Sequence, residues 1–266
     1  MPAAAPGPSD ALYALDGNRA LPGPLTVGPW SPDSQHGGPV AALLGRAVEA
    51  IATPVPMQVM RLTVELLRPV PLAPLEIATS VLRMGTRVGF VEASVSAGGA
   101  VVATSRALMI RVGEARVPEP EQWPATPTEP LAATPRPRSA GDPPAFHLDA
   151  MEMRFARGSW EEGGPAVVWE RLAVPVVAGE EPSPLQRAAA AADSGNGISR
   201  VVPFSDYVFV NPDLTVALWR PPAGEWVGLD VRTRLDGRGW GQAESLLFDP
   251  VGPCGRAVQS LYVQGR

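Results

Sequence analysis

The sequence predicts an α+β protein in which two tandem antiparallel sheets each wrap a long central helix. Three observations lead to this fold class: one segment occurs twice, each copy lies in the same order of helix and strand patterns, and a proline-rich stretch separates the copies. Self-similarity of this kind indicates that one supersecondary unit is duplicated within the 266 residues.

The duplicated segment gives the register of the repeat. Residues 62–70 read LTVELLRPV and residues 214–222 read LTVALWRPP, which agree at six of nine positions with an offset of 152. The same offset places Glu92 on Glu244. Because the surrounding patterns also match in order, we interpret the agreement as a repeat of the whole fold.

In the first copy, a long apolar helix is predicted at residues 37–51. Val40, Leu44 and Val48 recur at helical spacing, and Pro39 suits the first turn. Since the segment is apolar nearly all round, other elements must cover it. One strand-like run precedes it and four follow it, separated by Pro and Gly turns, at residues 12–21, 60–70, 75–84, 88–97 and 100–112.

The second copy repeats this order. Ser183 and Pro184 predict the start of a helix that is rich in alanine, and Gly195 and Gly197 predict its end. Strand-like runs lie before and after it, at residues 150–158, 166–174, 206–221, 225–235, 239–248 and 255–264.

A proline-rich stretch divides the two copies. Residues 117–145 are short of aliphatic side chains and have no period, which predicts an extended linker. We therefore expect an N-terminal unit over residues 1–116 and a C-terminal unit over residues 146–266.

Composition excludes several function classes. A formal net charge of -5 argues against nucleic acid or a membrane as partner. All 22 basic residues are arginines, so the chain has neither a P-loop lysine nor a Schiff-base amine. Cys254 is the single cysteine and there are two histidines, so we expect no disulfide and no metal site. The first ten residues show no secretory signal, and a cytoplasmic location is expected.

Five segments carry a resemblance to a known family. They read GPWSPDSQHGG, RLTVELLRPVP, AADSGNGIS, NPDLTVALWRPPAGEW and GRAVQSLYV. Together they resemble the acyl-CoA thioesterase II-like (TesB-like) family of double hotdog proteins. The resemblance implies a double hotdog fold and hydrolysis of a fatty or related acyl-CoA to free acid and CoA, without a cofactor. The alternative is a catalytically inactive hotdog protein that binds an acyl ligand or a partner. Exposed sheet edges would also suit a homo-oligomer.

The resemblance further implies three catalytic residues in the second copy. Asp193 takes the place of the family's helix acid, Asn211 that of a hydroxyl or amide residue, and Gln259 that of a strand glutamine. Better-known members carry threonine where this chain has Asn211. A carboxylate near two amides could accept a proton from a water whose oxygen the amides position.

Each of the three residues also has a structural alternative. Asp193 ends a helix, where the macrodipole disfavours a negative charge, and could simply cap the turn. Asn211 precedes a proline and could open a turn, while a strand glutamine such as Gln259 commonly faces solvent. At the repeat offset, Asn211 corresponds to Val59 and Gln259 to Ala107, and these apolar side chains cannot do this chemistry. We therefore expect one site per chain.

The start of the first helix is a candidate for substrate binding. His36, Gly37 and Gly38 lie where unpaired backbone N–H groups collect, and we expect them to bind substrate and receive the thioester oxygen as it becomes an oxyanion. Alternatively, the two glycines only allow a tight turn. Hydratase chemistry would need a His–Asp pair on the catalytic helix, and neither His36 nor His147 falls on a predicted helix.

The two repeated segments both end in Arg-Pro. Arg68 and Arg220 close the matching strands, and either could be imagined on a phosphate of CoA. Because both occupy the same place in the repeat, we predict a structural role for them at the junction of the halves.

Overall fold

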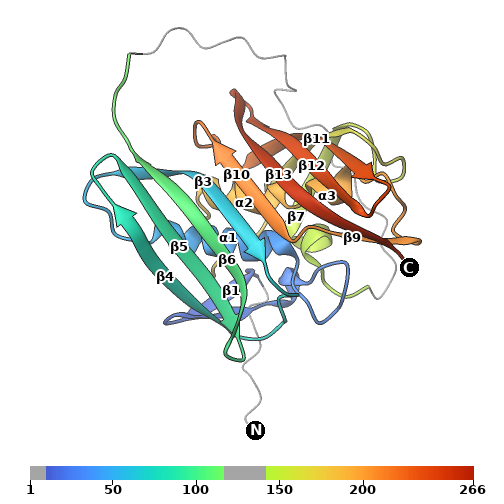
Figure 1. The fold of residues 1–266 in the computed structure, drawn as a ribbon, viewed down its shortest axis with the longest axis horizontal. Coiled ribbons are helices and arrows are strands. Elements are labelled where there is room, and N and C mark those ends of the chain that lie inside the picture. Colours follow the sequence, from blue (N-terminus) through green and yellow to red (C-terminus); the bar gives the residue numbers. More distant parts are fainter. Residues whose placement is uncertain (1–9, 117–141) are drawn as a thin grey trace.

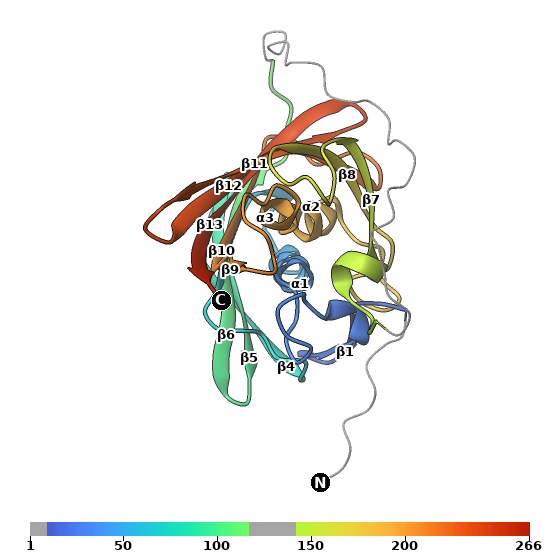
Figure 2. The ribbon, with the colours of Figure 1, turned by 90° about the vertical axis from the view of Figure 1, so that its right-hand side faces the viewer.

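The computed structural model describes residues 10–116 and 142–266. Within these ranges thirteen strands form one sheet, and the sheet curves around the helices at the centre (Figures 1 and 2). The predicted linker covers residues 117–145, and of these only residues 142–145 belong to the described part of the chain.

The N-terminal half consists of a hairpin, a helix and four long strands. The strand predicted at residues 12–21 is this hairpin, because Gly17 takes a φ of 60° and reverses the chain. The elements are β1 (Tyr13–Asp16), β2 (Arg19–Pro22), the 3-10 turn η1 (Pro24–Thr26), α1 (Gly37–Glu49), β3 (Met57–Leu66), β4 (Leu75–Met84), β5 (Val88–Ala97) and β6 (Ala100–Arg111).

The C-terminal half repeats this order with short additions. Its elements are the π-helical turn η2 (Phe146–Ala150), β7 (Met151–Arg157), β8 (Ala166–Leu172), α2 (Pro184–Ala192), α3 (Gly195–Ile198), β9 (Tyr207–Val210), β10 (Asp213–Leu218), β11 (Trp226–Asp236), β12 (Trp240–Asp249) and β13 (Gly252–Gly265).

Two boundaries in the C-terminal half differ from the prediction. Residues 206–221 form two strands, β9 and β10, because Pro212 has no N–H to donate and the chain leaves the ladder there. Gly195 and Gly197 do not end the helical region but lie in α3, the short helix that follows α2.

The strand bounds agree with the repeat. β5 and β12 begin and end at positions that differ by the repeat offset, and β6 and β13 begin at such positions. β3 pairs with β10, with Thr63 opposite Thr215 and their hydroxyl oxygens 3.2 Å apart. The two equivalent threonines therefore mark a pseudo-twofold axis. This pairing also joins the two predicted sheets into one continuous sheet.

The helices lie inside the curved sheet, as Figure 2 shows end-on. Almost every residue of α1 is buried, and the alanines of α2 are buried against it. Gly45 of α1 packs beside Leu185 of α2, since a Cβ added to Gly45 would lie in van der Waals contact at 3.6 Å from Leu185 Cδ2. None of the helices in the described part of the chain is both long and apolar enough to cross a membrane.

Candidate active site

A cavity of about 520 Å³ lies where the N-terminus of α1 meets the C-terminus of α2. The loop before α1, the end of β3, α3 and the connection from β9 to β10 all contribute to its lining. Its apolar wall includes Trp30, Phe204 and Phe209, whose ring centroids are 4.8 to 5.6 Å apart. An apolar cavity with a few convergent polar groups is typical of a small-molecule site.

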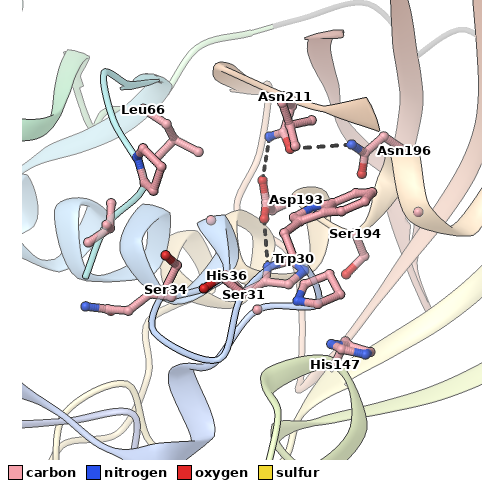
Figure 3. A pocket seen from close by; sticks show the side chains of 18 of the residues that line it. Trp30, Ser31, Ser34, His36, Leu66, His147, Asp193, Ser194, Asn196 and Asn211 are labelled. Carbon is pink, nitrogen blue, oxygen red and sulfur yellow. Dashed lines mark hydrogen bonds and ion pairs between the residues drawn. The ribbon is translucent and has the colours of Figure 1, made fainter. Parts of the chain in front are cut away.

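The polar groups converge on Asp193, which is the C-cap of α2 and 3% exposed. His36 Nδ1 lies 2.8 Å from Asp193 Oδ2, and Asn211 Nδ2 donates to Asp193 Oδ1 at 2.7 Å (Figure 3). Gln259 Nε2 donates to the backbone carbonyl of Asp193 at 3.0 Å and lies 3.4 Å from Oδ1. The structure thus brings the three residues predicted in the C-terminal half together, with the amides of Asn211 and Gln259 at Asp193.

The surroundings keep this carboxylate ionised. Burial raises the pKa of Asp193, but the hydrogen bond and charge of His36, with hydrogen bonds from Asn211 and the Gly38 N–H, outweigh it, so the pKa lies below its ordinary value. The dipole of α2 disfavours a charge at its C-terminus, whereas the positive N-terminus of α1 faces the same carboxylate. The N-terminus of α1 therefore stabilises the negative charge of Asp193 at the C-terminus of α2.

Asn211 and Gln259 differ in their access to the cavity. Asn211 lines it, and its amide hydrogens go to Asp193 and, at 3.2 Å, to the Asp213 carbonyl. Gln259 is 2% exposed, is not among the described lining residues, and accepts the Asn196 N–H at 3.0 Å. Gln259 therefore positions Asp193 and α3 from the side away from the cavity, while Asn211 is placed to contact a bound molecule.

The loop into α1 brings its backbone to the carboxylate. His36 is the N-cap, and its Nδ1 lies 3.1 Å from the Gly38 nitrogen as well as against Asp193. An Nδ1–H donated to Asp193 leaves the Gly38 N–H for the same carboxylate, in agreement with its lowered pKa. A Cβ on Gly37 would lie 2.7 Å from Asp193 Oδ2, and one on Gly38 would lie 2.7 Å from Phe146 Cε1. Both glycines are therefore required by close packing.

Of these three residues, His36 and Gly37 line the cavity, and Gly38 is not among the described residues that do. The oxyanion role expected of this segment stays a prediction.

The sequence prediction missed a second acidic group. Glu170 of β8 is fully buried, accepts a hydrogen bond from Ser194 Oγ at 3.1 Å, and has no partner for Oε1 among the described residues. Burial raises the pKa of Glu170 well above its ordinary value, which favours the neutral form of this side chain. Ser194 lines the cavity and connects it to Glu170. The signal was an acidic residue inside the apolar run AVVWERL.

The structure contains a His–Asp pair that the sequence analysis did not predict. His36 at the start of α1 meets Asp193 at the end of α2. The two residues come from different halves, so a search within one helix could not find them. His147 also lines the cavity, with its ring centroid 6.1 Å from that of His36. Residues 10–116 and 142–266 contain no cluster of three or more His, Cys, Asp or Glu that could hold a metal ion.

The two repeated arginines have different environments. Arg220 makes a bidentate ion pair with the buried Asp249 and donates to the Gly252 carbonyl, so its structural role is confirmed, within its own half. Arg68 is exposed and belongs to the lining of the cavity. Among the described residues, no side-chain hydrogen bond or ion pair supports the structural role predicted for Arg68, which stays a prediction.

Comparison with protein families identifies the chain. A family model described as the acyl-CoA thioesterase N-terminal domain matches residues 26–110, and one described as the acyl-CoA thioesterase C-terminal domain matches residues 119–263. The chain belongs to the acyl-CoA thioesterase family. It is accordingly a thioester hydrolase, and the family predicted from the five segments is confirmed. No curated protein matches the sequence.

Solved structures show the same fold at low sequence identity. A putative thioesterase II from Thermobifida fusca is 19% identical with a TM-score of 0.73, and the match covers 97% of this chain and 98% of that one. A protein of unknown function with a hot dog fold from Alicyclobacillus acidocaldarius is 19% identical with a TM-score of 0.72, covering 97% of both chains. The acyl-CoA thioesterase II TesB2 from Mycobacterium marinum is 18% identical with a TM-score of 0.67, covering 96% of this chain and 95% of that one. The acyl-CoA thioesterase therefore has the hot dog fold.

Proposed function

We propose that this thioesterase hydrolyses fatty or related acyl-CoA thioesters with a water molecule that Asp193 activates. The observation that supports it is the convergence of His36, Asn211 and Gln259 on the Asp193 carboxylate, at the polar end of an otherwise apolar cavity. The apolar part suits an acyl chain, and the polar end suits the thioester.

We further propose that residues 1–116 and 146–266 are two hotdog units joined by the linker at residues 117–145. In this view each half of the continuous sheet wraps its own helix. The pairing of Thr63 with Thr215 and the matching strand bounds support it. The active site then lies between the units, because one contributes the start of α1 and the other the end of α2.

In the proposed reaction, the water donates one hydrogen to Asp193 and the other to the Asn211 carbonyl oxygen. With both hydrogens held, a lone pair of the water oxygen is directed at the thioester carbon. Asp193 takes the proton as the new C–O bond forms, a task for which positioning matters as much as base strength. Gln259 acts as a positioning residue, since it contacts Asp193 rather than the cavity.

The electrons of the carbonyl bond move to its oxygen as the water adds. The Gly37 N–H belongs to the first turn of α1, where it has no intrahelical partner, and we assign it to this oxyanion. When the C–S bond breaks, the CoA thiolate leaves and takes the proton that Asp193 received. The products are the free acid and CoA, and Asp193 is again ionised.

Turnover of a chain-length series of acyl-CoA substrates, followed by release of the CoA thiol, tests the proposal. Asp193→Asn keeps the size of the side chain but cannot accept the proton, so kcat should fall by about 10² to 10⁴-fold. Asp16→Asn, at an exposed position of the other half, is the matched control and should keep full activity. Full turnover by Asp193→Asn would refute the mechanism, and no turnover of any acyl-CoA by the unmodified enzyme would refute the substrate class. Hydration of an enoyl-CoA should be absent.

A further inference from the structure

We propose that Arg68 binds a phosphate group of the CoA part of the substrate at the rim of the cavity. The inference rests on the proposed function, because it concerns the same cavity and the same substrate. The proposal assigns a side chain that recognises the CoA part of the substrate rather than the acyl chain.

The repeat shows that Arg68 lacks the carboxylate partner that its counterpart has. Its counterpart Arg220 is held by the buried Asp249, which also accepts backbone N–H groups from the loops around it. At the repeat offset, position 249 corresponds to Ala97, the last residue of β5. The N-terminal half therefore keeps the arginine but has no carboxylate at the place that would hold it.

The backbone fixes where Arg68 lies. The Leu66 N–H donates to the Pro212 carbonyl at 2.7 Å, directly beside Asn211. Two residues further on, the Arg68 N–H donates to the Val102 carbonyl at 3.3 Å. Arg68 thus stands on an anchored segment in the lining of the same cavity as Asp193, and its side chain makes no hydrogen bond or ion pair with any residue that the structure describes.

A free guanidinium at this place fits a phosphate by charge and by shape. Arginine presents a planar set of donors that binds phosphate oxygens in pairs. The chain carries a formal net charge of -5, which by itself repels a ligand with several phosphates. A local cation at the mouth of the cavity compensates for that repulsion where the CoA part must enter.

Calorimetric binding of CoA and of pantetheine, which has no phosphate, tests the proposal without any need for turnover. Arg68→Gln should weaken CoA binding roughly tenfold or more, as loss of a charged hydrogen bond does, and leave pantetheine binding unchanged. Arg83→Gln, at an exposed arginine of β4, is the control and should bind CoA like the unmodified enzyme. Equal effects on both ligands, or no effect on either, would overturn the proposal.

Dephospho-CoA identifies which phosphate Arg68 binds. If Arg68→Gln weakens CoA but not dephospho-CoA, the contact is to the 3′-phosphate; if it weakens both, the contact is to the diphosphate. Either result supports the proposal.

Restoring the lost carboxylate gives a second test that leaves Arg68 in place. Ala97→Asp should capture Arg68 as Asp249 captures Arg220, and weaken CoA binding, whereas the neutral Ala97→Asn should not. Equal binding by a folded Ala97→Asp and Ala97→Asn would count against the proposal. The outcome is separate from that of the proposed function: Arg68-dependent CoA binding without acyl-CoA turnover would refute only the function, and turnover without this dependence would refute only the phosphate contact.

Discussion

The two halves of the chain share a frame of strands but differ at the positions that face the site. Asn211 and Gln259 of the C-terminal half correspond, at the repeat offset, to Val59 and Ala107 of the N-terminal half. Both counterparts are buried apolar residues of the core. One half has therefore kept an apolar interior where the other has amides that hold a carboxylate.

Strand pairing extends this comparison to Glu170. Glu170 lies opposite Val227 in the C-terminal half, and Ala20 lies opposite Leu75, the counterpart of Val227, in the N-terminal half. Both Ala20 and Glu170 are fully buried. The acidic group therefore replaces a methyl group at an equivalent place in the sheet.

The contacts between the helices show what each half contributes. Gly37 at the start of α1 faces Asp193 at the end of α2, and the reciprocal contact joins Leu185 at the start of α2 to Gly45 in α1. The first contact carries a charge and a free helix N-terminus, and the second is ordinary apolar packing. The difference shows that the pseudo-twofold axis relates the frames of the halves but not their chemistry.

The largest effect is expected from a methyl group added at Gly37, and the same change at Gly45 is the comparison. Gly37→Ala would push the Asp193 carboxylate out of place, and displacement by about 1 Å costs roughly 10²-fold in rate. Gly45→Ala has ordinary van der Waals space and should leave kcat/KM unchanged while raising helix stability by about 0.5 to 1 kcal/mol. Steady-state kinetics and thermal unfolding of the two variants measure this. Similar losses of activity in both would show that the contacts are equivalent after all.

The next effect compares the repeated arginines by stability. Arg220→Gln removes the cation from the buried Asp249, which keeps its backbone donors, so the free energy of unfolding should fall by about 2 kcal/mol. Arg68→Gln removes no partner seen in the described residues and should leave stability within about 0.5 kcal/mol. Denaturant unfolding separates the two. A loss at Arg68 as large as that at Arg220 would mean that Arg68 has a structural role.

The last prediction concerns Glu170, where only the dependence of stability on pH is expected to change. Because its pKa is raised in the folded state, Glu170 contributes stability that is fully present below the unfolded pKa and is lost as the pH rises through the folded pKa. Glu170→Gln removes this dependence, so the free energy of unfolding of the variant should rise relative to that of the unmodified enzyme as the pH increases above about 4, by at most about 1.4 kcal/mol for each pH unit. Glu162→Gln, at an exposed position, is the control and should show no such trend. A difference in the free energy of unfolding that stays constant with pH would contradict the assignment.

The repeat, the two longer helices and most strands could be predicted from the sequence, because hydrophobic period, Ser183 and the Pro and Gly turns act within a few residues of the chain. The choice of Asp193, Asn211 and Gln259 came from the resemblance, and the structure places all three together. The element boundaries at Gly17 and Pro212 needed the pairing partners of each strand.

Three features depend on contacts between distant parts of the chain: His36 meets Asp193, Glu170 lies buried next to Ser194, and Arg68, unlike Arg220, has no side-chain partner among the described residues. These contacts depend on how two helices cross and on how β3 pairs with β10. No local pattern encodes such a crossing, because its geometry follows from the packing of both halves at once.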